Sequence, residues 1–562
     1  MATTENPVGI EARAPMLAAL DGPAALRELS HEQLTHLAEE IRTVVIDTVD
    51  RNGGHLGSNL GAVELTIALH RAFDSPRDLL LFDTGHQTYP HKLLTGRLPR
   101  FDSLRTPGGL SGYPAREESE HDLVENSHAS TILSWAHGLA TARRLRGDEG
   151  HVVAVIGDGS LTGGMAWEGL NNLGASGTDC LVIVNDNGRS YAPTVSRLGE
   201  GLARSDTGAE LFGCLGLTYL GSVDGHDLHA LDAALRVATT RRGPRVLHVR
   251  TEKGRGHQPA LDDPIKRMHD TSVTRPDSYT ASFGRAIVEL GAADPRVVAL
   301  PAAMPDSTGL LEFAEQFPDR CFDVGIAEQH AVTMAAGLAM GGLVPVVAIY
   351  STFLTRALDQ VVYDVGLHDL GVIFCLDRAG ITGDDGASHH GVLDLALLSR
   401  IPGMTILTPS CLADLPEMLR YAHQVATAPN PGPVAIRWSK TVPTTGTVRS
   451  LGTSPARVVR EGSAVCLVAD DHALTANMER MLRRLRPELA PAASKRILEI
   501  NPEHPLVQAM EKRLAQDRND PRLEQHARLL YDQAVILEGS KVKDPLAFAR
   551  RLNDPLLGSV SA

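Results

Sequence analysis

The chain has 562 residues, with 54 Lys and Arg against 68 Asp and Glu, which gives a formal net charge of −14. This surplus of acidic residues argues against a nucleic acid as the partner. The longest apolar runs, such as Cys180–Val184 and Val344–Ile349, are far shorter than the ~18 residues of a membrane span. The N-terminus shows no basic region followed by an apolar one, as a signal peptide would. We therefore expect a cytoplasmic protein of several domains that binds neither nucleic acid nor membrane.

In the first half of the chain, short β-branched runs that end in Gly or Asp alternate with longer helical stretches. His151–Ile156 leads into Gly157-Asp158-Gly159, and Leu181–Val184 leads into Asn185-Asp186-Asn187. This alternation predicts an α/β fold with a doubly wound parallel sheet. Ligands bind such sheets at the carboxyl ends of the strands, so we expect the chemistry at these two polar exits.

A second αβ series begins near Tyr279, after a polar stretch from Gly254 to Ser278 that we interpret as a linker. Its predicted strands are Val297–Leu300, Val344–Ile349, Val372–Leu376 and Thr405–Leu407. After about Ser463 the pattern changes to charged amphipathic helices, at Met478–Leu485, Leu506–Leu514, Leu523–Leu537 and Pro545–Leu552. The expected organisation is two α/β domains over residues 1–277 and 278–446, a linker over 447–462, and a mostly helical domain over 463–562.

Asp158 and Asn187 form a candidate metal site. Asn187 follows Asp158 by 29 positions, which is enough for a loop, a helix and a strand, so both side chains should lie at neighbouring strand tips. Mg²⁺ prefers oxygen ligands and shares its coordination shell with phosphates. Asp158, Asn187 and a backbone carbonyl near Arg189 are therefore predicted to bind a metal and a diphosphate. Gly-Asp-Gly alone is also a common structural turn, and this alternative stays open at this point.

These residues and several other motifs carry a family resemblance. The motifs are Gly54–Gly61, Asp83–Lys92, Gly157–Asn187, Val223–His226, Lys253–Gly256, Asp323–His330, Tyr350–Arg356 and Asp377–Gly380. Between about Leu26 and Gly462 the chain resembles the 1-deoxy-D-xylulose-5-phosphate synthases of the transketolase superfamily. The resemblance implies a transferase that uses thiamine diphosphate and Mg²⁺. It would condense pyruvate with glyceraldehyde 3-phosphate, with loss of CO₂, to 1-deoxy-D-xylulose 5-phosphate, an isoprenoid, thiamine and pyridoxal precursor.

The resemblance also implies roles for individual residues. Glu328 matches the glutamate that contacts N1′ of the cofactor's pyrimidine, and His55 and His389 would transfer protons while Asp385 orients the acceptor's hydroxyls. The implied cofactor-binding residues are His86, Ser127, His128, Ala129, Asp158, Gly159, Ser160, Asn187, His257, Glu328 and Phe353. The implied substrate-binding residues are Tyr350, Arg356, Arg378 and Lys440, of which Arg378 matches the family's phosphate-binding arginine. Each histidine, taken singly, has the alternative of an ordinary packing role.

The sequence departs from the family pattern in three ways before the tail. Lys440 stands where the family has a second arginine, and lysine keeps the charge but loses the bidentate fork. The segment between Val195 and Leu217 is shorter than in the family, and His257 occupies a position where tyrosine is common. The alternatives are a related carboligase with a different acceptor aldehyde, or a catalytically impaired fusion protein.

Residues 447–462 are predicted to be a linker and a remnant of the transketolase C-terminal domain, and the tail after them resembles a different family. Cys466–Leu482, Lys495–Val507 and Leu530–Ala534 are similar to the C-terminal dimerisation region of bacterial heat-shock-protein-ninety chaperones. The resemblance implies a homodimer held by a helical bundle. The residues expected on the apolar face of that bundle are Leu523, Ala527, Leu530, Ala534, Leu537, Phe548 and Leu552.

Overall fold

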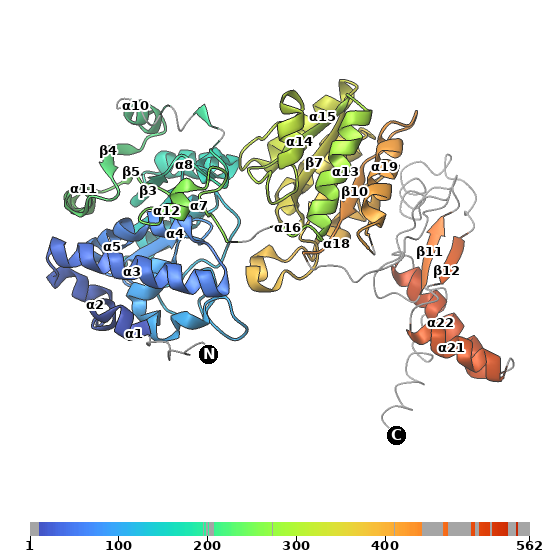
Figure 1. Ribbon diagram of the computed structural model, residues 1–562, viewed down its shortest axis with the longest axis horizontal. Coiled ribbons are helices and arrows are strands. Elements are labelled where there is room, and N and C mark those ends of the chain that lie inside the picture. The colour runs from blue at the N-terminus through green and yellow to red at the C-terminus, as the bar shows by residue number, and fades with distance from the viewer. Residues whose placement is uncertain are drawn as a thin grey trace, which may run out of the picture. The chain divides into compact units, whose positions relative to one another are not determined.

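The computed structural model describes residues 10–194, 196–197, 201, 207–271, 274–409, 411–440, 465–469, 496–500, 505–517, 520–537, 544 and 547–548. The chain divides into two compact units, Met1–Gly452 and Thr453–Ala562, which are described separately below (Figure 1). The domain boundaries predicted from the sequence remain predictions.

The first α/β domain of the first unit is built on a five-stranded parallel sheet of order β1-β2-β3-β5-β4. Its strands are β1 (Leu79–Phe82), β2 (Val152–Gly157), β3 (Cys180–Asp186), β4 (Thr218–Asp224) and β5 (Pro244–Arg250). Its helices are α1 (Ile10–Arg13), α2 (Pro15–Ala18), α3 (His31–Asn52), α4 (Gly57–Gly61), α5 (Val63–Ala72), α6 (Tyr89–Lys92), α7 (Ile132–Arg146), α8 (Gly164–Ser176), α10 (Thr207–Cys214), α11 (Leu228–Thr240) and α12 (Gln258–Asp262). The two strands predicted from the sequence are confirmed as β2 and β3.

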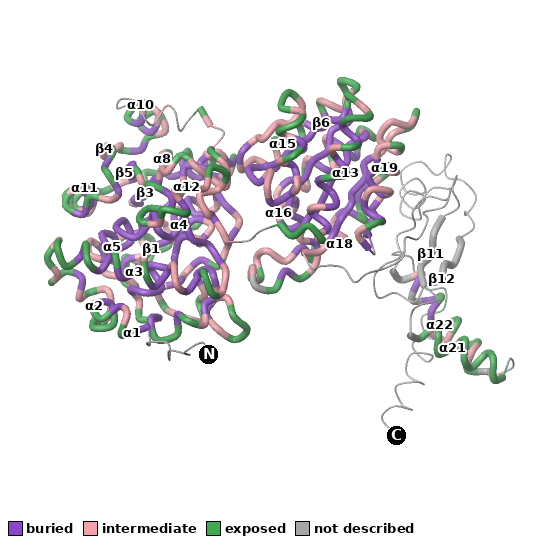
Figure 2. Tube along the Cα trace, in the orientation of Figure 1, coloured by how far each residue is buried: buried purple, intermediate pink, exposed green. Residues whose placement is uncertain are grey.

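Both faces of this sheet are covered, which explains why its central strands are continuous apolar runs. Val153 and Val155 of β2 pack in one cluster with α5 and α11. Ala154 and Ile156, which alternate with them, pack in another cluster with α7 and α8. In Figure 2 these strands are coloured as buried. The predicted doubly wound arrangement is therefore confirmed.

The second α/β domain has a five-stranded parallel sheet of order β6-β7-β8-β10-β9. Its strands are β6 (Val297–Pro301), β7 (Val344–Tyr350), β8 (Ile373–Asp377), β9 (Thr405–Leu407) and β10 (Val434–Arg437). Its helices are α13 (Tyr279–Ala293), α14 (Leu311–Gln316), α15 (Glu328–Met340), α16 (Ser351–Leu354), α17 (Leu358–Gln360), α18 (Asp394–Leu398) and α19 (Asp414–Ala426). Helix α15 packs on β6 and β7 through Ala331, Val332 and Ala335. All four strands predicted here are confirmed.

The segment interpreted as a linker is packed against the first domain over part of its length. It contains α12, and the backbone amides of Leu56 and Gly57 donate hydrogen bonds to the carbonyls of His269 (3.2 Å) and Met268 (2.8 Å). The His269 side chain is buried. This part of the segment therefore belongs structurally to the first α/β domain.

The described part of the second unit contains two antiparallel strands, β11 (Val465–Ala469) and β12 (Arg496–Ile500), and two helices, α21 (Pro505–Gln516) and α22 (Pro521–Leu537). The helices predicted over 506–514 and 523–537 are confirmed. The one predicted over 478–485, and most of the one over 545–552, lie outside the described residues. None of the described helices of either unit is long and apolar enough to span a membrane.

Candidate active site

The structure brings Asp158 and Asn187 together, as their spacing predicts. Strands β2 and β3 are neighbours with Gly157 opposite Asn185, and the Asp158 amide donates to the Asn185 carbonyl at 3.2 Å. The Asp158 carboxylate is 4% exposed and accepts hydrogen bonds from the Asn187 amide (3.3 Å) and the Thr194 hydroxyl (2.8 Å). A buried carboxylate therefore lies at the carboxyl edge of the sheet, where ligands bind in this class of fold.

Asp158 and Lys253 place one acidic and one basic group at this edge of the sheet, where they can bind a cation together with an anion. Burial, helped by nearby Asp186, raises the pKa of Asp158 to about 6. Burial lowers the pKa of Lys253 to about 7, against the opposing effect of Asp158. Lys253 also donates to the Ser190 carbonyl and lies 2.9 Å from Nδ1 of His269. The described residues contain no group of three or more His, Cys, Asp or Glu that could hold a metal, so a metal at Asp158 would need oxygen ligands from a phosphate group as well.

Glu328 is the second buried carboxyl group of the site, at the first position of α15. The residue is 5% exposed, and Oε2 accepts no hydrogen bond from any residue that the structure describes. The nearest cation is Arg356, whose Nη1 lies 3.6 Å from Oε2. Burial raises the pKa of Glu328, with Arg356 opposing the shift. A buried polar atom without a partner is costly in a protein and is typical of a group that meets a ligand.

One cavity joins these two carboxyl groups. It is lined by Asp158 and Asn187 from the first α/β domain and by Glu328 and Phe353 from the second. The other predicted cofactor or metal residues that line it are His86, Ser127, Ala129, Gly159, Ser160 and Arg189. Nδ1 of His86 is also buried without a hydrogen-bond partner among the described residues. The cavity thus exposes two buried carboxyl groups, one from each α/β domain, to a single bound ligand.

Two predicted cofactor residues lie outside the lining of this cavity, as far as the described residues show. Nε2 of His128 is 3.1 Å from the Thr352 hydroxyl and 3.1 Å from the Ser388 carbonyl, and its ring packs on Phe353. His128 therefore supports the cavity wall from behind. His257 precedes α12 and is half-buried.

Each predicted proton-transfer residue lies against a residue that lines the cavity. Nδ1 of His389 is 3.0 Å from the Ser127 hydroxyl, and the His55 ring lies 5.5 Å from that of His86. Burial lowers the pKa of His55 to about 3 and that of His389 to about 4. Both imidazoles are therefore neutral at physiological pH, the form in which one ring nitrogen accepts a proton and the other donates one.

The predicted acceptor-binding residues fall into two groups. Asp385 accepts hydrogen bonds from Lys440 (2.7 Å) and Arg105 (3.3 Å), so Lys440 faces the residue predicted to orient the acceptor. The Arg378 guanidinium stacks on the Tyr350 ring at 4.3 Å, and Arg378 has a positive φ of 57°. Such a conformation is costly for a side-chain-bearing residue and occurs preferentially at functional sites.

Arg356 is predicted to bind substrate, as are Tyr350 and Arg378. In the structure its guanidinium contacts Glu328 and donates to the Ala129 carbonyl. Arg356 thereby connects the second α/β domain to the first at the base of the cavity.

Sequence reasoning missed several residues of this site. Tyr191 stacks on His269 with ring centroids 3.9 Å apart, and His269 stacks on His86 at 4.9 Å. Both line the cavity, and they come from polar loops without periodicity or motif spacing. Lys253 also lines it, and its position in the Lys253–Gly256 motif was the available signal.

Comparisons with known proteins agree with this geometry. A family model of the N-terminal region of 1-deoxy-D-xylulose-5-phosphate synthase matches residues 17–210 and 205–251, and a model of the transketolase pyrimidine-binding domain matches residues 276–443. The 1-deoxy-D-xylulose-5-phosphate synthase of Mycobacterium avium is 51% identical over 477 residues, which cover 76% of this chain and 74% of that protein. The chain belongs to the 1-deoxy-D-xylulose-5-phosphate synthase family.

A second relative, 1-deoxy-D-xylulose-5-phosphate synthase 2 of Streptomyces avermitilis, is 50% identical over 478 residues, with 76% of this chain and 74% of that protein covered. The tail from 455 to 562 matches the family model described as Hsp90 protein. Among solved structures, a transketolase from Campylobacter jejuni aligns over 84% of this chain and 88% of its own, with 16% identity and a TM-score of 0.37, from which we infer nothing. The two segments matched by the synthase model overlap at 205–210, inside the interval from Val195 to Leu217 that the sequence analysis predicts to be shorter than in the family.

Proposed function

We propose that this protein condenses pyruvate with glyceraldehyde 3-phosphate, with loss of CO₂, to 1-deoxy-D-xylulose 5-phosphate, using thiamine diphosphate and Mg²⁺. The observation that carries the proposal is the cavity that joins buried Asp158 to buried Glu328, whose Oε2 has no hydrogen bond among the described residues, in a chain 51% identical to such a synthase over 76% of its length. When bound, thiamine diphosphate supplies the nucleophilic carbon that permits decarboxylation.

Asp158, Asn187 and the Arg189 carbonyl would hold Mg²⁺ and, through it, the diphosphate. Gly159 and Ser160 follow Asp158 directly and offer backbone amides to phosphate oxygens. Lys253, buried on the same side of the cavity, adds a positive charge when it is protonated.

Glu328 would hold a proton at the other end of the cavity. Its raised pKa favours the protonated carboxyl, which donates a hydrogen bond to a ring nitrogen. The charge of the neighbouring Arg356 opposes this shift. The low-polarity surroundings of Phe353 strengthen this interaction.

His55 and His389 would exchange protons with the substrates, because both are neutral and adjacent to the cavity. Asp385 is held by Lys440 and Arg105. Burial would raise its pKa, but the charge and the hydrogen bond of Lys440, together with the charge of Arg105, keep the pKa low. A carboxylate fixed in this way accepts hydrogen bonds from the acceptor's hydroxyl groups. Arg378, with its guanidinium oriented by Tyr350, would bind the acceptor's phosphate.

One observation favours a second candidate, a carboligase with another acceptor aldehyde. Lys440, which replaces the family's arginine, already donates to Asp385 and lacks the second donor pair of a guanidinium. A weaker hold on phosphate would widen the range of acceptors.

The test is an assay of the purified full-length chain with thiamine diphosphate, Mg²⁺ and pyruvate, with and without glyceraldehyde 3-phosphate. CO₂ release and products are followed by mass spectrometry. A five-carbon deoxyketose phosphate formed only with the phosphorylated acceptor is expected. Equal use of unphosphorylated aldehydes would favour the second candidate, and cofactor binding without decarboxylation would refute both.

We further propose that the protein is a cytoplasmic homodimer. The Hsp90-type tail supports the homodimer. On α22, Leu523 is only half-buried and Ala527 is exposed, so both are accessible to a second copy of the chain. Leu530 and Ala534 are instead buried against α21 within the same chain, so only part of the predicted face is available. The first unit has an apolar groove lined by Trp135, Leu139 and Met165 among others, and Trp135 is 49% exposed.

Light scattering after size exclusion, on the full chain and on the chain cut after Gly462, distinguishes these surfaces. A full-length monomer would refute the dimer. A cut chain that is still fully dimeric would assign the interface to the first unit instead of the tail.

A further inference from the structure

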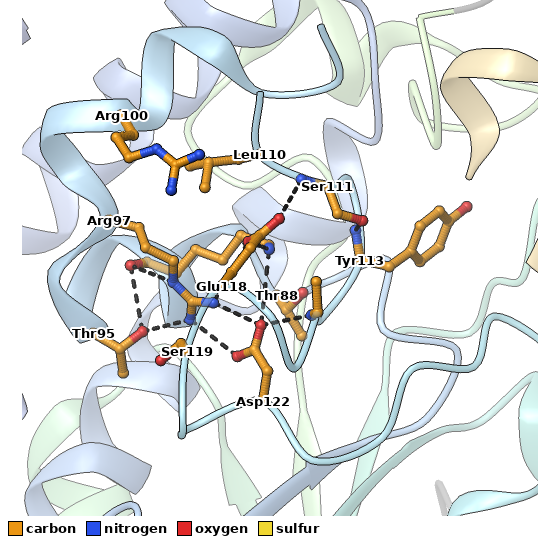
Figure 3. A network of polar contacts seen from close by, with 12 residues as sticks. Thr88, Thr95, Arg97, Arg100, Leu110, Ser111, Tyr113, Glu118, Ser119 and Asp122 are labelled. Carbon is orange, nitrogen blue, oxygen red and sulfur yellow. Dashed lines mark hydrogen bonds and ion pairs between the residues drawn. The ribbon is translucent and has the colours of Figure 1, made fainter. Parts of the chain in front are cut away.

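A buried network of ion pairs lies beneath the loop that follows α6 (Figure 3). Lys92 donates to Glu118, and Arg97 makes a bidentate pair with Asp122 at 2.6 and 3.0 Å. The Lys92 and Asp122 side chains are fully buried. Because burying ion pairs costs desolvation energy, such a network is weak evidence for a role in stability alone. It therefore calls for another explanation.

The two carboxylates of this network also hold two backbone amides. Glu118 accepts from the Ser111 amide at 2.5 Å, and Asp122 accepts from the Ala115 amide at 2.8 Å. Ser111 and Ala115 lie two residues before and two residues after Tyr113. Charge-assisted hydrogen bonds of this kind are stronger than neutral ones. The backbone of Tyr113 is thus fixed from both sides.

The Tyr113 side chain lies between the two histidines assigned to proton transfer. It is 7% exposed, and its ring centroid is 5.5 Å from that of His55 and 5.4 Å from that of His389. His55 comes from the first α/β domain and His389 from the second. Nδ1 of His55 has no hydrogen-bond partner among the described residues, so the orientation of this ring depends largely on packing.

We propose that Tyr113 is a positioning residue for His55 and His389, and that the ion pairs Lys92–Glu118 and Arg97–Asp122 hold it in place. This inference rests on the roles proposed above for the two histidines. The aromatic ring performs the positioning, because the Tyr113 hydroxyl is as far as 3.5 Å from Nε2 of His389 while the ring packs against both imidazoles.

Substitutions of Tyr113 in the full-length chain separate the ring from the hydroxyl. We expect Tyr113→Phe to keep kcat within about threefold, and Tyr113→Leu to lower kcat about 10- to 50-fold with the KM for pyruvate within about twofold, because misplacement of catalytic groups mainly slows the chemical step. A Leu variant with unchanged kcat, or a Phe variant as impaired as the Leu variant, would overturn the proposal.

The network is tested by a double-mutant cycle. Glu118→Gln should lower kcat about tenfold, and this loss should largely disappear in the Tyr113→Leu background, since coupled residues are not additive. If the effects of the two substitutions on kcat are fully additive, Glu118 does not act through Tyr113. Glu417→Gln, which breaks an exposed ion pair with Arg420 on α19, is the matched control and should leave kcat unchanged.

A second measurement needs neither cofactor nor turnover. Diethyl pyrocarbonate labels accessible neutral imidazoles, and peptide mass spectrometry reports the labelling rates of His55 and His389 separately in the cofactor-free protein. Tyr113→Leu should raise both rates about fivefold, and Tyr113→Phe should not. Unchanged labelling rates in the Leu variant would overturn the positioning role. If the labelling rates rise as expected but the protein has no synthase activity, the proposed function is wrong and the positioning role stands. If Glu118→Gln does not fold, the Tyr113 variants still decide.

Discussion

The Glu328 carboxyl group is expected to reduce the stability of the cofactor-free protein while it serves catalysis. Its Oε2 is buried and without a hydrogen bond among the described residues, and such an unsatisfied group costs about 1–3 kcal/mol. Its pKa is raised by burial, so ionisation is disfavoured in the folded state. Glu328→Gln keeps the shape and removes the ionisable group. The free energy of unfolding at pH 7 should therefore stay the same or rise by about 1 kcal/mol, because Arg356 keeps its bond to the Ala129 carbonyl.

Activity should respond in the opposite direction, with kcat for product formation lower by about 10²- to 10⁴-fold, the usual contribution of a positioned acid or base. Glu64→Gln is a matched control for stability. The pKa of Glu64 is lowered to about 2, although burial opposes the shift, by hydrogen bonds from His226 and Arg42. Its ionised form stabilises the fold above the unfolded pKa, so the loss on substitution is about 3 kcal/mol at pH 7.

Urea unfolding of the cofactor-free variants measures both free energies, and the synthase assay measures both activities. A Glu328→Gln variant that is destabilised as strongly as Glu64→Gln, or that retains more than about a tenth of wild-type kcat, would contradict this role of Glu328.

Three further predictions follow from the site. Lys440→Arg should lower the KM for glyceraldehyde 3-phosphate about 3- to 10-fold by restoring a guanidinium beside Asp385, and steady-state kinetics with an unchanged KM would contradict this role. Asp158→Asn should weaken Mg²⁺-dependent binding of thiamine diphosphate at least about 100-fold in calorimetry, as EDTA should for the wild type, and binding that survives both would exclude the metal site. The pKa of His389 is lowered to about 4 by burial, against 6.5 when unfolded, so protons favour the unfolded state and stability falls as pH drops from 6.5 towards 4. His389→Gln should remove up to about 3 kcal/mol of this loss, which unfolding curves at pH 7.5 and 4.5 would show.

The strands that sequence analysis found and missed differ in their surroundings. β2 and β3 are buried on both faces, so they read as continuous apolar runs that end in Asp or Asn. β4 is an edge strand, mostly exposed or half-buried, and its pairing with β5 shifts register between Tyr219 and Ser222. β12 is short and contains Arg496 and Glu499. Such strands carry no periodic hydrophobic signal, because tertiary pairing determines them.

The site shows the same division. Asp158, Asn187 and Glu328 could be predicted because each stands at a strand or helix end inside a motif. His269 and Tyr191 could not, since single residues in polar loops reach the cavity only through the path of the chain. The contact of Arg356 with Glu328 could not be predicted either, because spacing along the sequence does not show which side chains an arginine will contact in the folded protein.

The position of the site along the chain bears on what the unusual tail can do. All predicted catalytic, cofactor and substrate residues lie between His55 and Lys440, and the structure places them in the first compact unit. The segment matched by the Hsp90 model begins at residue 455, after the last of them. The tail therefore supplies none of the groups that the proposed chemistry requires. Its effect on catalysis would have to act through assembly, since interactions within a dimer change the stability and access of a site without supplying its reacting groups.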